Sequence, residues 1–409
     1  MTQTAGVRLG SARPSDYRVI AGVSAAHCIS HYYMLLLPPL FVFVRAEFGV
    51  SYVELGLALS LFNIFSAALQ TPAGFLVDKI SAQAVLIGGL LLGTVAFFIA
   101  GLSSSYWMLV AMFAIAGIGN AVYHPADYSI LSHQVAPERM GQAFSIHTFA
   151  GMLGSAAAPA SLILLQGYVG WRGAFLVAAA FGLVVAGVLA VLLLSPGTEP
   201  AAARPAEKPL PSAATAAPTA GWQLLLSGPI MRNLLFFILF SMVSLGIQSY
   251  AVVALAALHD TSLKVGNTAL SGYLLLSAGG VLFGGYLVGQ TARHGSVATI
   301  GMLVTGLVAV IVALVDLGPV LLIIAFSAGG FFLGLIMPSR DMIVREVTPP
   351  GSFGKVFGFV TTGFNIGGVI VPLAFGAMMD HGSPAAVFLV IALCCLLSIL
   401  TLVSSRRAT

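Results

Sequence analysis

The chain has 409 residues, of which 59% are hydrophobic and only 7% carry a charge. Because a soluble globular chain is about 25% charged, this composition excludes a soluble enzyme and is typical of an integral membrane protein, with the lipid bilayer as its partner. The net charge of +4 does not indicate nucleic-acid binding here, since its meaning depends on which side of the membrane each charge lies.

Twelve apolar stretches are each long enough for the roughly 20 residues that cross a bilayer core of about 30 Å. Residues 1–17 form a polar tail, and six predicted spans follow it, at residues 18–44, 51–77, 82–102, 106–135, 139–167 and 172–194. Residues 195–229 form a predicted linker, because the many prolines in its first part cannot continue a helix. Six more spans precede a short tail at 405–409, at residues 230–257, 265–290, 296–316, 318–346, 352–379 and 384–404.

The sequence therefore predicts an all-α membrane protein with twelve transmembrane helices in two six-helix bundles, residues 18–194 and 230–404. Placing both termini and alternate loops on one side gathers 14 of the 17 Lys and Arg residues there, and leaves Arg45, Arg172 and Lys264 on the other side. Cytoplasmic loops carry an excess of Lys and Arg, so we expect both tails and the linker in the cytoplasm.

Two short patterns bear on local structure. Ser51 followed by Glu54 has the spacing of a capping box, which predicts that a helix begins there. The three cysteines, Cys28, Cys394 and Cys395, lie inside apolar runs with no spacing that indicates a zinc site or a disulfide framework. We therefore expect no metal and no cofactor.

The segment Gly117–Pro159 is repeated without a gap 213 positions later, as Gly330–Pro372. Six identical pairs keep this offset: Pro125 and Pro338, Pro137 and Pro350, Gly141 and Gly354, Phe144 and Phe357, Gly154 and Gly367, and Pro159 and Pro372. At the same offset Asp127 falls opposite Arg340, so the copies carry opposite charges at one equivalent place. The repeat predicts that the two halves share one fold. We expect the function to depend on the residues in which the two copies differ, above all on Asp127 and Arg340.

Polar residues inside the spans are few, and an ionisable one costs about 2.5 to 3.5 kcal/mol on insertion scales, so each is a functional hypothesis. His27 and His31 share a face of the first span, and three polar residues share a stripe of the fourth. Arg340 is the only cation deep in the second half. The candidate substrate and proton-coupling residues are Asp127, Arg340, His31, His124, Asn120, Tyr123, His27 and Asn365, and His147 in the fifth span is a further histidine of the same kind.

Asp127 and Arg340 admit several roles, which the residues alone leave open. One is a structural clasp between the halves that closes the cytoplasmic side. A second role is functional: Arg340 binds an anionic substrate, or Asp127 accepts the coupling proton. The two roles are compatible, because a clasp that a ligand or proton breaks would itself act as a gate. His31 and His124 are either proton carriers, because imidazole titrates near neutral pH, or hydrogen-bonded packing residues.

The segment Gly74-Phe75-Leu76-Val77-Asp78-Lys79 after the second span resembles the loop signature of the major facilitator superfamily. The family pattern continues with a glycine and two basic residues, where this chain has Ser81-Ala82-Gln83, so the resemblance implies a weaker cytoplasmic latch. The expected cytoplasmic gate consists of Gly74, Asp78, Lys79 and Arg139. The resemblance also implies alternating access, in which two similar bundles rock about a site between them.

Further motifs resemble the fosmidomycin-resistance branch of that superfamily, namely Ser30-His31, Tyr52-Val53-Glu54-Leu55-Gly56, Leu69-Gln70-Thr71-Pro72-Ala73-Gly74, Tyr123-His124-Pro125 and Ser145-Ile146. The chain departs from the branch at Met34-Leu35, where the branch has Asn-Asp, and at Ala126-Asp127, where the acid comes one residue late. These departures leave open whether the substrate is the same as that of the branch.

This resemblance implies a monomeric secondary transporter of a bacterial inner membrane and not an enzyme. The expected function is proton-coupled efflux of small polar or anionic organic compounds, such as fosmidomycin or another drug, so the expected partners are an anionic or zwitterionic small molecule and protons. One alternative is proton-coupled import of a small organic anion such as a carboxylate, with Arg340 as the anion anchor. Another is a membrane sensor that has the same fold and transports nothing.

Overall fold

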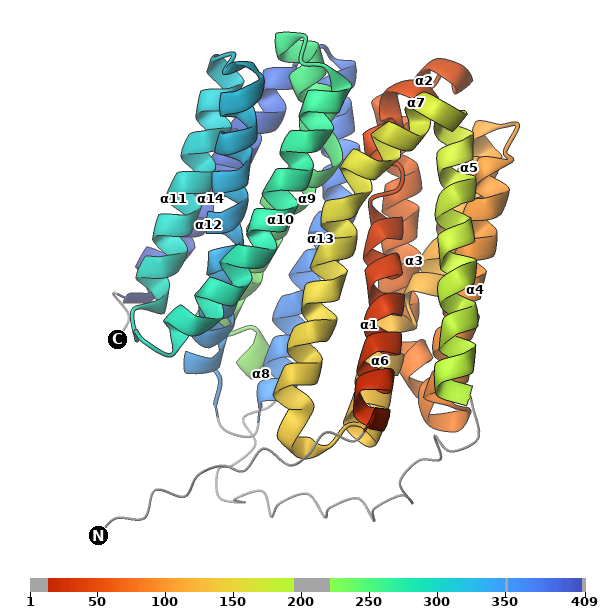
Figure 1. Ribbon diagram of the computed structural model, residues 1–409. Coiled ribbons are helices and arrows are strands. Elements are labelled where there is room, and N and C mark those ends of the chain that lie inside the picture. Colours follow the sequence, from red (N-terminus) through yellow and green to blue (C-terminus); the bar gives the residue numbers. More distant parts are fainter. Residues whose placement is uncertain (1–13, 195–220, 350–351, 407–409) are drawn as a thin grey trace.

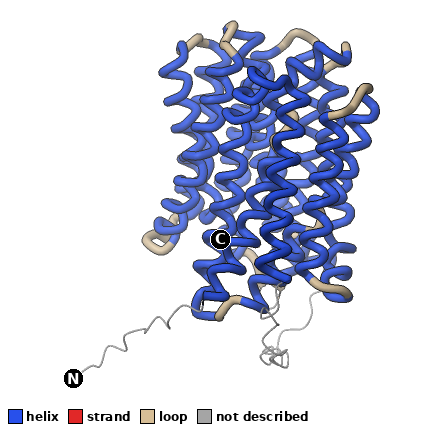
Figure 2. The backbone as a smooth tube through the Cα atoms, turned by 45° about the vertical axis from the view of Figure 1, so that its right-hand side comes forward, coloured by secondary structure: helices blue, strands red, loops and turns tan. Residues whose placement is uncertain are grey.

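The computed structural model describes residues 14–194, 221–349 and 352–406, and Figure 2 shows that helices make up most of this part. The helices of the first half are α1 (Pro14–Met34), η1 (Pro38–Leu40), α2 (Phe41–Phe48), α3 (Tyr52–Lys79), α4 (Ala82–Gly101), α5 (Tyr106–Asn120), α6 (Tyr123–Gln134), η2 (Pro137–Arg139) and α7 (Met140–Leu194). Those of the second half are α8 (Gly221–Leu225), α9 (Gly228–His259), α10 (Leu263–Val288), α11 (His294–Leu314), α12 (Gly318–Glu346), α13 (Phe353–Asp380) and α14 (Pro384–Arg406).

Of the predicted tails and linker, residues 1–13, 195–220 and 407–409 lie outside the described residues. The long helices lie side by side, and α1 begins at the same end of the molecule at which α14 ends (Figure 1). We call this end the terminal face and the opposite end the far face.

Within the described residues, eleven segments are long and apolar enough to cross a membrane. The longest of them lies in α7, which has 55 residues and would measure about 80 Å if it were straight, more than twice the thickness of a bilayer core. Gly170 interrupts it with φ 70 and ψ 172, and the chain reverses there at the far face (Figure 1). We call residues 140–169 the first arm of α7 and residues 171–194 its second arm.

Two spans predicted as continuous are broken by proline. The predicted span 18–44 ends as α1 at Met34 and resumes at Pro38, because the adjacent Pro38 and Pro39 provide no backbone N–H groups for a continuing helix. The predicted span 106–135 stops at Asn120 and resumes at Tyr123, since the ring of Pro125 conflicts with the carbonyl group four residues earlier. Each interrupted stretch still forms one candidate membrane span, at Asp16–Phe48 and Tyr106–Gln134.

The predicted capping box is confirmed. The Ser51 hydroxyl accepts a hydrogen bond from the backbone N–H of Glu54 at 3.1 Å, and the Glu54 carboxylate accepts one from the backbone N–H of Ser51 at 2.7 Å. These bonds satisfy N–H groups that would otherwise lack partners at the start of α3. They fix where α3 begins at the far face.

Repeated glycines let equivalent helices approach each other in the two halves. A Cβ atom on Gly154 would overlap with the backbone carbonyl of Cys28 in α1, and one on Gly367 would overlap with Ser241 in α9. In the same way Gly117 packs on the backbone of α3 and Gly330 on that of α10. Small residues permit such backbone contacts between membrane helices.

Hydrogen bonds between α3 and α13 close the far face. The Asp380 carboxylate at the end of α13 accepts bonds from the N–H groups of Tyr52 at 2.8 Å and Val53 at 2.9 Å, the first residues of α3. A carboxylate at this place also complements the positive end of the helix dipole. Nearer the centre, the Ser60 hydroxyl donates to the carbonyl of Val369 at 3.1 Å.

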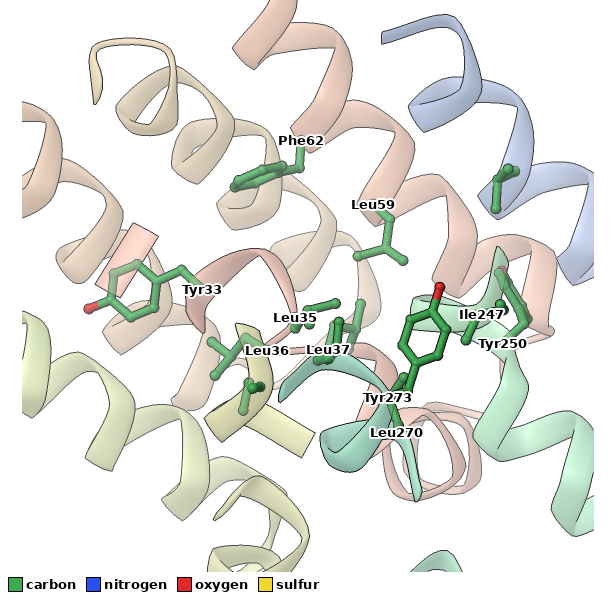
Figure 3. Close-up of a cluster of buried hydrophobic side chains, with 14 of the residues drawn as sticks. Tyr33, Leu35, Leu36, Leu37, Leu59, Phe62, Ile247, Tyr250, Leu270 and Tyr273 are labelled. Atoms are coloured by element: carbon green, nitrogen blue, oxygen red, sulfur yellow. The ribbon is translucent and has the colours of Figure 1, made fainter. Parts of the chain in front are cut away.

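Apolar side chains from both halves fill the space behind these bonds. Figure 3 shows Leu35, Leu36 and Leu37, which follow α1, gathered with side chains of α3, α9 and α10. Among the latter, the Tyr250 hydroxyl donates to the carbonyl of Pro372 at 2.5 Å. Burial of this apolar surface excludes water between the halves near the far face.

Replacing Gly154 with alanine tests the glycine contacts. Because the Cys28 carbonyl belongs to the backbone of α1 and cannot turn aside, we expect Gly154→Ala to lower the free energy of unfolding by about 1 to 3 kcal/mol, seen as a lower thermal midpoint in detergent. Gly88→Ala is the control, since no atom lies within 4 Å of a Cβ at Gly88. Equal midpoints for the two variants would contradict the contact.

Candidate functional site

Four histidines and one aspartate meet inside the first half. We call His27, His31, His124, Asp127 and His147 the histidine cluster; they come from α1, α6 and the first arm of α7. The His27 ring lies 3.8 Å from that of His147, 4.6 Å from that of His31 and 5.5 Å from that of His124, measured between centroids. The structure thus brings together four of the predicted site residues and adds His147.

Asp127 lies at the centre of the cluster and is 0% exposed. Its Oδ2 atom lies 3.3 Å from His27 Nδ1 and 3.6 Å from His147 Nε2. Within the described residues neither carboxylate oxygen of Asp127 accepts a hydrogen bond. A buried carboxylate without hydrogen bonds carries a large desolvation cost, and the imidazoles of His27 and His147 are within ion-pairing distance of it.

The surroundings of the cluster fix its rings. The His31 Nδ1 atom lies 3.1 Å from the Ser155 hydroxyl, which orients that imidazole. Gly151 leaves room for the rings, because a Cβ there would lie only 2.6 Å from a carbon of His27 and 3.0 Å from one of His31. Tyr128 packs edge-on against His147 and is about half exposed, so it stands between the cluster and the molecular surface.

Asn120, which is half-buried, and Tyr123, which is buried, lie beside the cluster and have other surroundings. The Asn120 carbonyl accepts a hydrogen bond from Ser30 at 3.0 Å, and its NH₂ group donates to Ser66 at 2.8 Å. Asn120 thereby ties α5 to α1 and α3 in the interior. Tyr123 is 4% exposed, at the first position of α6.

Arg340 is buried in the second half, on α12. Its Nε and Nη2 atoms donate to Asp341 Oδ1 at 2.9 and 2.8 Å, whereas Nη1 has no hydrogen-bond partner among the described residues. The guanidinium carbon lies 4.4 Å from the ring centroid of Phe237, and the rings of Phe240 and Phe364 lie at 5.3 and 5.2 Å. Aromatic faces stabilise a cation that has little contact with water.

The structure shows no clasp between the two charges. In the part of the chain that is described, no ion pair joins Asp127 to Arg340, and each has its partners within its own half. Asp127 and Arg340 therefore occupy equivalent positions in the repeat but do not contact each other. Asp127 lies among histidines, whereas Arg340 pairs with an aspartate and lies among phenyl rings. Asn365 is exposed on α13, one residue beyond a phenylalanine that contacts Arg340.

A cleft lies between the halves towards the terminal face. Its volume is about 370 Å³, and its lining comes from the first arm of α7, from α10 and from Pro338 of α12. The α7 side includes Phe144, Ser145 and Thr148, and the α10 side ends at Gly285. Pro338 lies two residues before Arg340 on α12, and residues at this spacing lie on different faces of a helix, so Arg340 does not itself line the cleft.

The predicted gate residues are spread over the terminal face. Asp78 and Lys79 at the end of α3 are exposed and form no ion pair within the described ranges. No atom lies within 4 Å of a Cβ at Gly74. Arg139 instead reaches α1, where its Nε atom lies 3.9 Å from the Asp16 carboxylate and its guanidinium lies over Tyr17.

Comparison with known families and proteins gives one family and several transporters. The profile described as Major Facilitator Superfamily matches residues 23–318 and 239–408. The Fosmidomycin resistance protein of Escherichia coli strain K12 is 24% identical over 399 residues, which is 95% of this chain and 93% of that protein. The Probable sulfoacetate transporter SauU of Cupriavidus necator is 33% identical over 141 residues, 34% of this chain and 33% of that protein.

Solved structures share the fold. The nucleoside transporter NupG superposes with a TM-score of 0.78 at 14% identity. The match covers 97% of this chain and 100% of the NupG chain. A bacterial homolog to the human lysosomal transporter Spinster, in an inward-facing and occupied conformation, has a TM-score of 0.77 at 15% identity, covering 97% of this chain and 96% of that one. At these identities the likeness shows the fold alone.

Exchange of the two buried charges tests their separate pairing. Each of Asp127→Arg and Arg340→Asp breaks buried contacts and is expected to cost about 3 to 5 kcal/mol of stability. Because the two residues do not face each other, the double exchange should not recover the thermal midpoint in detergent.

Glu47 and Arg172 provide a matched control, since they pair directly and are partly exposed. The exchange Glu47→Arg with Arg172→Glu should recover much of what either single change loses. Recovery in the Asp127 and Arg340 exchange instead would show that the two charges meet in a major conformation of the protein.

Proposed function

Because this chain belongs to the Major Facilitator Superfamily, we propose that it is a secondary active transporter driven by the proton gradient, which exports small polar or anionic organic compounds from the cell. We count the two arms of α7 as separate spans, which gives twelve spans in two bundles of six. The terminal face is then cytoplasmic, in agreement with the concentration of Lys and Arg there, and the membrane is a bacterial inner membrane.

Transport is proposed to proceed by alternating access. The contacts between α3 and α13 close the far face, while the cleft between α7, α10 and α12 lies towards the terminal face, so this arrangement corresponds to a state open to the cytoplasm. A rocking motion of the halves would break the first set of contacts and close the cleft. Gly74, Asp78, Lys79 and Arg139 would then act as the cytoplasmic gate.

Arg340 is the observation that carries the proposed substrate class. A guanidinium group with a free donor, held among phenyl rings, suits a carboxylate, phosphonate or sulfonate, which accept two parallel hydrogen bonds. Asn365 of the neighbouring helix is proposed to take part on the same side. The other side of the site is assigned to the predicted residues of the first half, namely His27, His31, Asn120, Tyr123, His124 and Asp127.

Import of a small organic anion is the second candidate. An anion anchored at Arg340 can move in either direction, depending on the gradients across the membrane. Relatives over about a third of the chain bear the names Probable sulfoacetate transporter and Probable L-galactonate transporter, which favour this reading. The direction of transport therefore needs a direct measurement.

Changing Arg340 tests substrate class and direction together. In a bacterial strain without its own efflux pumps, expression of the chain should raise resistance to fosmidomycin. Arg340→Met should abolish that gain, because loss of one partner of a buried charge pair costs about 2 kcal/mol or more, roughly a 30-fold loss in affinity.

Arg340→Lys should retain part of the activity, and Arg293→Met, at an exposed position, should retain all of it. Uptake of labelled fosmidomycin into everted vesicles should stop when the pH gradient is collapsed. Accumulation in whole cells rather than resistance would replace export with import, and equal activity of Arg340→Met would remove Arg340 from the site.

Changing Asp380 tests the closure of the far face. Asp380→Asn removes the charge that caps α3, so we expect the protein to open more often at the far face. A cysteine at Ser60, which is 1% exposed between α3 and α13, should then react several-fold faster with a maleimide that cannot cross the membrane.

Asp260→Asn serves as the control, because Asp260 is exposed at the same face and caps no helix of the other half. A labelling rate that Asp380→Asn leaves unchanged would show that the far face is closed by other contacts.

A further inference from the structure

Three residues of the histidine cluster have the geometry of a metal site. One donor atom from each of His27, Asp127 and His147 lies within 4.8 Å of the other two. Two of these separations are 3.3 and 3.6 Å, both to Asp127 Oδ2. In a tetrahedral site with metal bonds of about 2.0 to 2.2 Å, neighbouring donors lie about 3.3 to 3.6 Å apart. The two histidine donors are therefore at this separation from Asp127 Oδ2, and they lie within 4.8 Å of each other.

The same atoms lack other partners. Within the described residues, His27 Nδ1, both oxygens of Asp127 and both ring nitrogens of His147 form no hydrogen bond. All three side chains are at most 5% exposed. Five unsatisfied polar atoms at one buried place would be costly, and a cation that they coordinate would remove that cost.

We propose that His27, Asp127 and His147 bind one divalent transition-metal ion inside the first half. Two imidazoles and a carboxylate favour Zn²⁺, Co²⁺ or Ni²⁺ over Mg²⁺ and Ca²⁺, which prefer oxygen ligands. Three protein ligands leave a fourth position for water or another ligand, as in sites where the bound metal stays accessible.

The neighbouring residues fit this assignment. Gly151 keeps the space that the His27 ring occupies, and the His31 ring is held through its Nδ1 atom by Ser155 instead of pointing that atom at the centre. The sequence spacing gave no sign of the site, because its ligands lie on three segments, with 100 positions between His27 and Asp127 and 20 between Asp127 and His147.

The metal site shares His27 and Asp127 with the first-half side of the proposed site but is separate from Arg340, the proposed anion anchor. Its ligands all belong to the first half, whereas Arg340 and its phenyl rings belong to the second. Metal binding therefore goes beyond the proposed function and does not rest on it. A chain that fails to export fosmidomycin can still bind the ion, and a chain that exports it can lack the ion.

The test uses the full chain, purified in detergent with an affinity tag that contains no histidine and stripped of metal with a chelator. Titration with Co²⁺ should give one ion per chain, with a visible absorption band of low coordination number that Zn²⁺ displaces and Mg²⁺ does not. X-ray absorption on the Zn²⁺-loaded wild-type protein should show two imidazole ligands, and this measurement needs no variant.

His147→Gln and Asp127→Asn are the informative variants. Loss of a direct ligand should weaken binding by more than the roughly 10- to 100-fold that loss of an outer hydrogen-bond partner costs. His381→Gln is the matched control, because His381 is an exposed histidine outside the cluster, and it should bind like the wild type.

Three results would overturn the proposal. One is the absence of saturable binding in the wild type, which would leave protons as the only occupants of the cluster. Another is equal affinity in the wild type, His147→Gln and Asp127→Asn, and the third is an X-ray absorption spectrum without imidazole ligands.

Discussion

A polar group inside an apolar bundle must find its partner within the protein, and this constraint orders the interior of the structure. Asn120 meets it with two serines from different helices. Arg340 meets it in part, with the adjacent Asp341 and the faces of three phenyl rings. Asp127 does not meet it within the described residues, although imidazoles surround it. Asp127 and Arg340 are thus buried charged groups with unsatisfied atoms, which they share with neutral buried residues such as Tyr273 and Asn267.

The repeat explains why these positions lie where they do. In each half, a glycine of the repeat lets one helix pack closely against the first long helix of that half. Gly154 of α7 packs on α1, and Gly367 of α13 packs on α9. The backbones of the two halves differ at the repeated proline. Pro125 follows a break between α5 and α6, whereas Pro338 lies inside the continuous helix α12. The same residue type therefore permits different backbones, and the charged residue two positions later enters a different environment in each half.

Much of the fold follows from the sequence because apolar length, proline clusters and the Ser51 and Glu54 capping pattern are local signals. The family also follows, from motifs that the profile match confirms. The partners of Asp127 and Arg340 do not follow, since pairing depends on how helices are placed in three dimensions. An equal offset in a repeat suggested a contact between the two, yet a repeat gives equivalent places in different halves, not neighbouring ones. His147 is a candidate from the sequence as a histidine inside a span, but its stacking on His27 depends on how the helices are placed.

The contacts that cross between the halves differ in kind from those inside them. The Asp380 carboxylate accepts a hydrogen bond from the backbone of α3, and the Tyr250 hydroxyl donates one to the Tyr52 carbonyl. Both bonds hold the far face with backbone groups of α3, which need no change of side-chain charge to separate. The contacts of Asp127 stay within α1, α6 and the first arm of α7, so rocking of rigid halves leaves them intact. An ion or proton at the cluster can then affect the cycle by changing the shape of the first half. Arg340 and its partner Asp341 lie together on α12 in the second half, so the same motion leaves their ion pair intact as well.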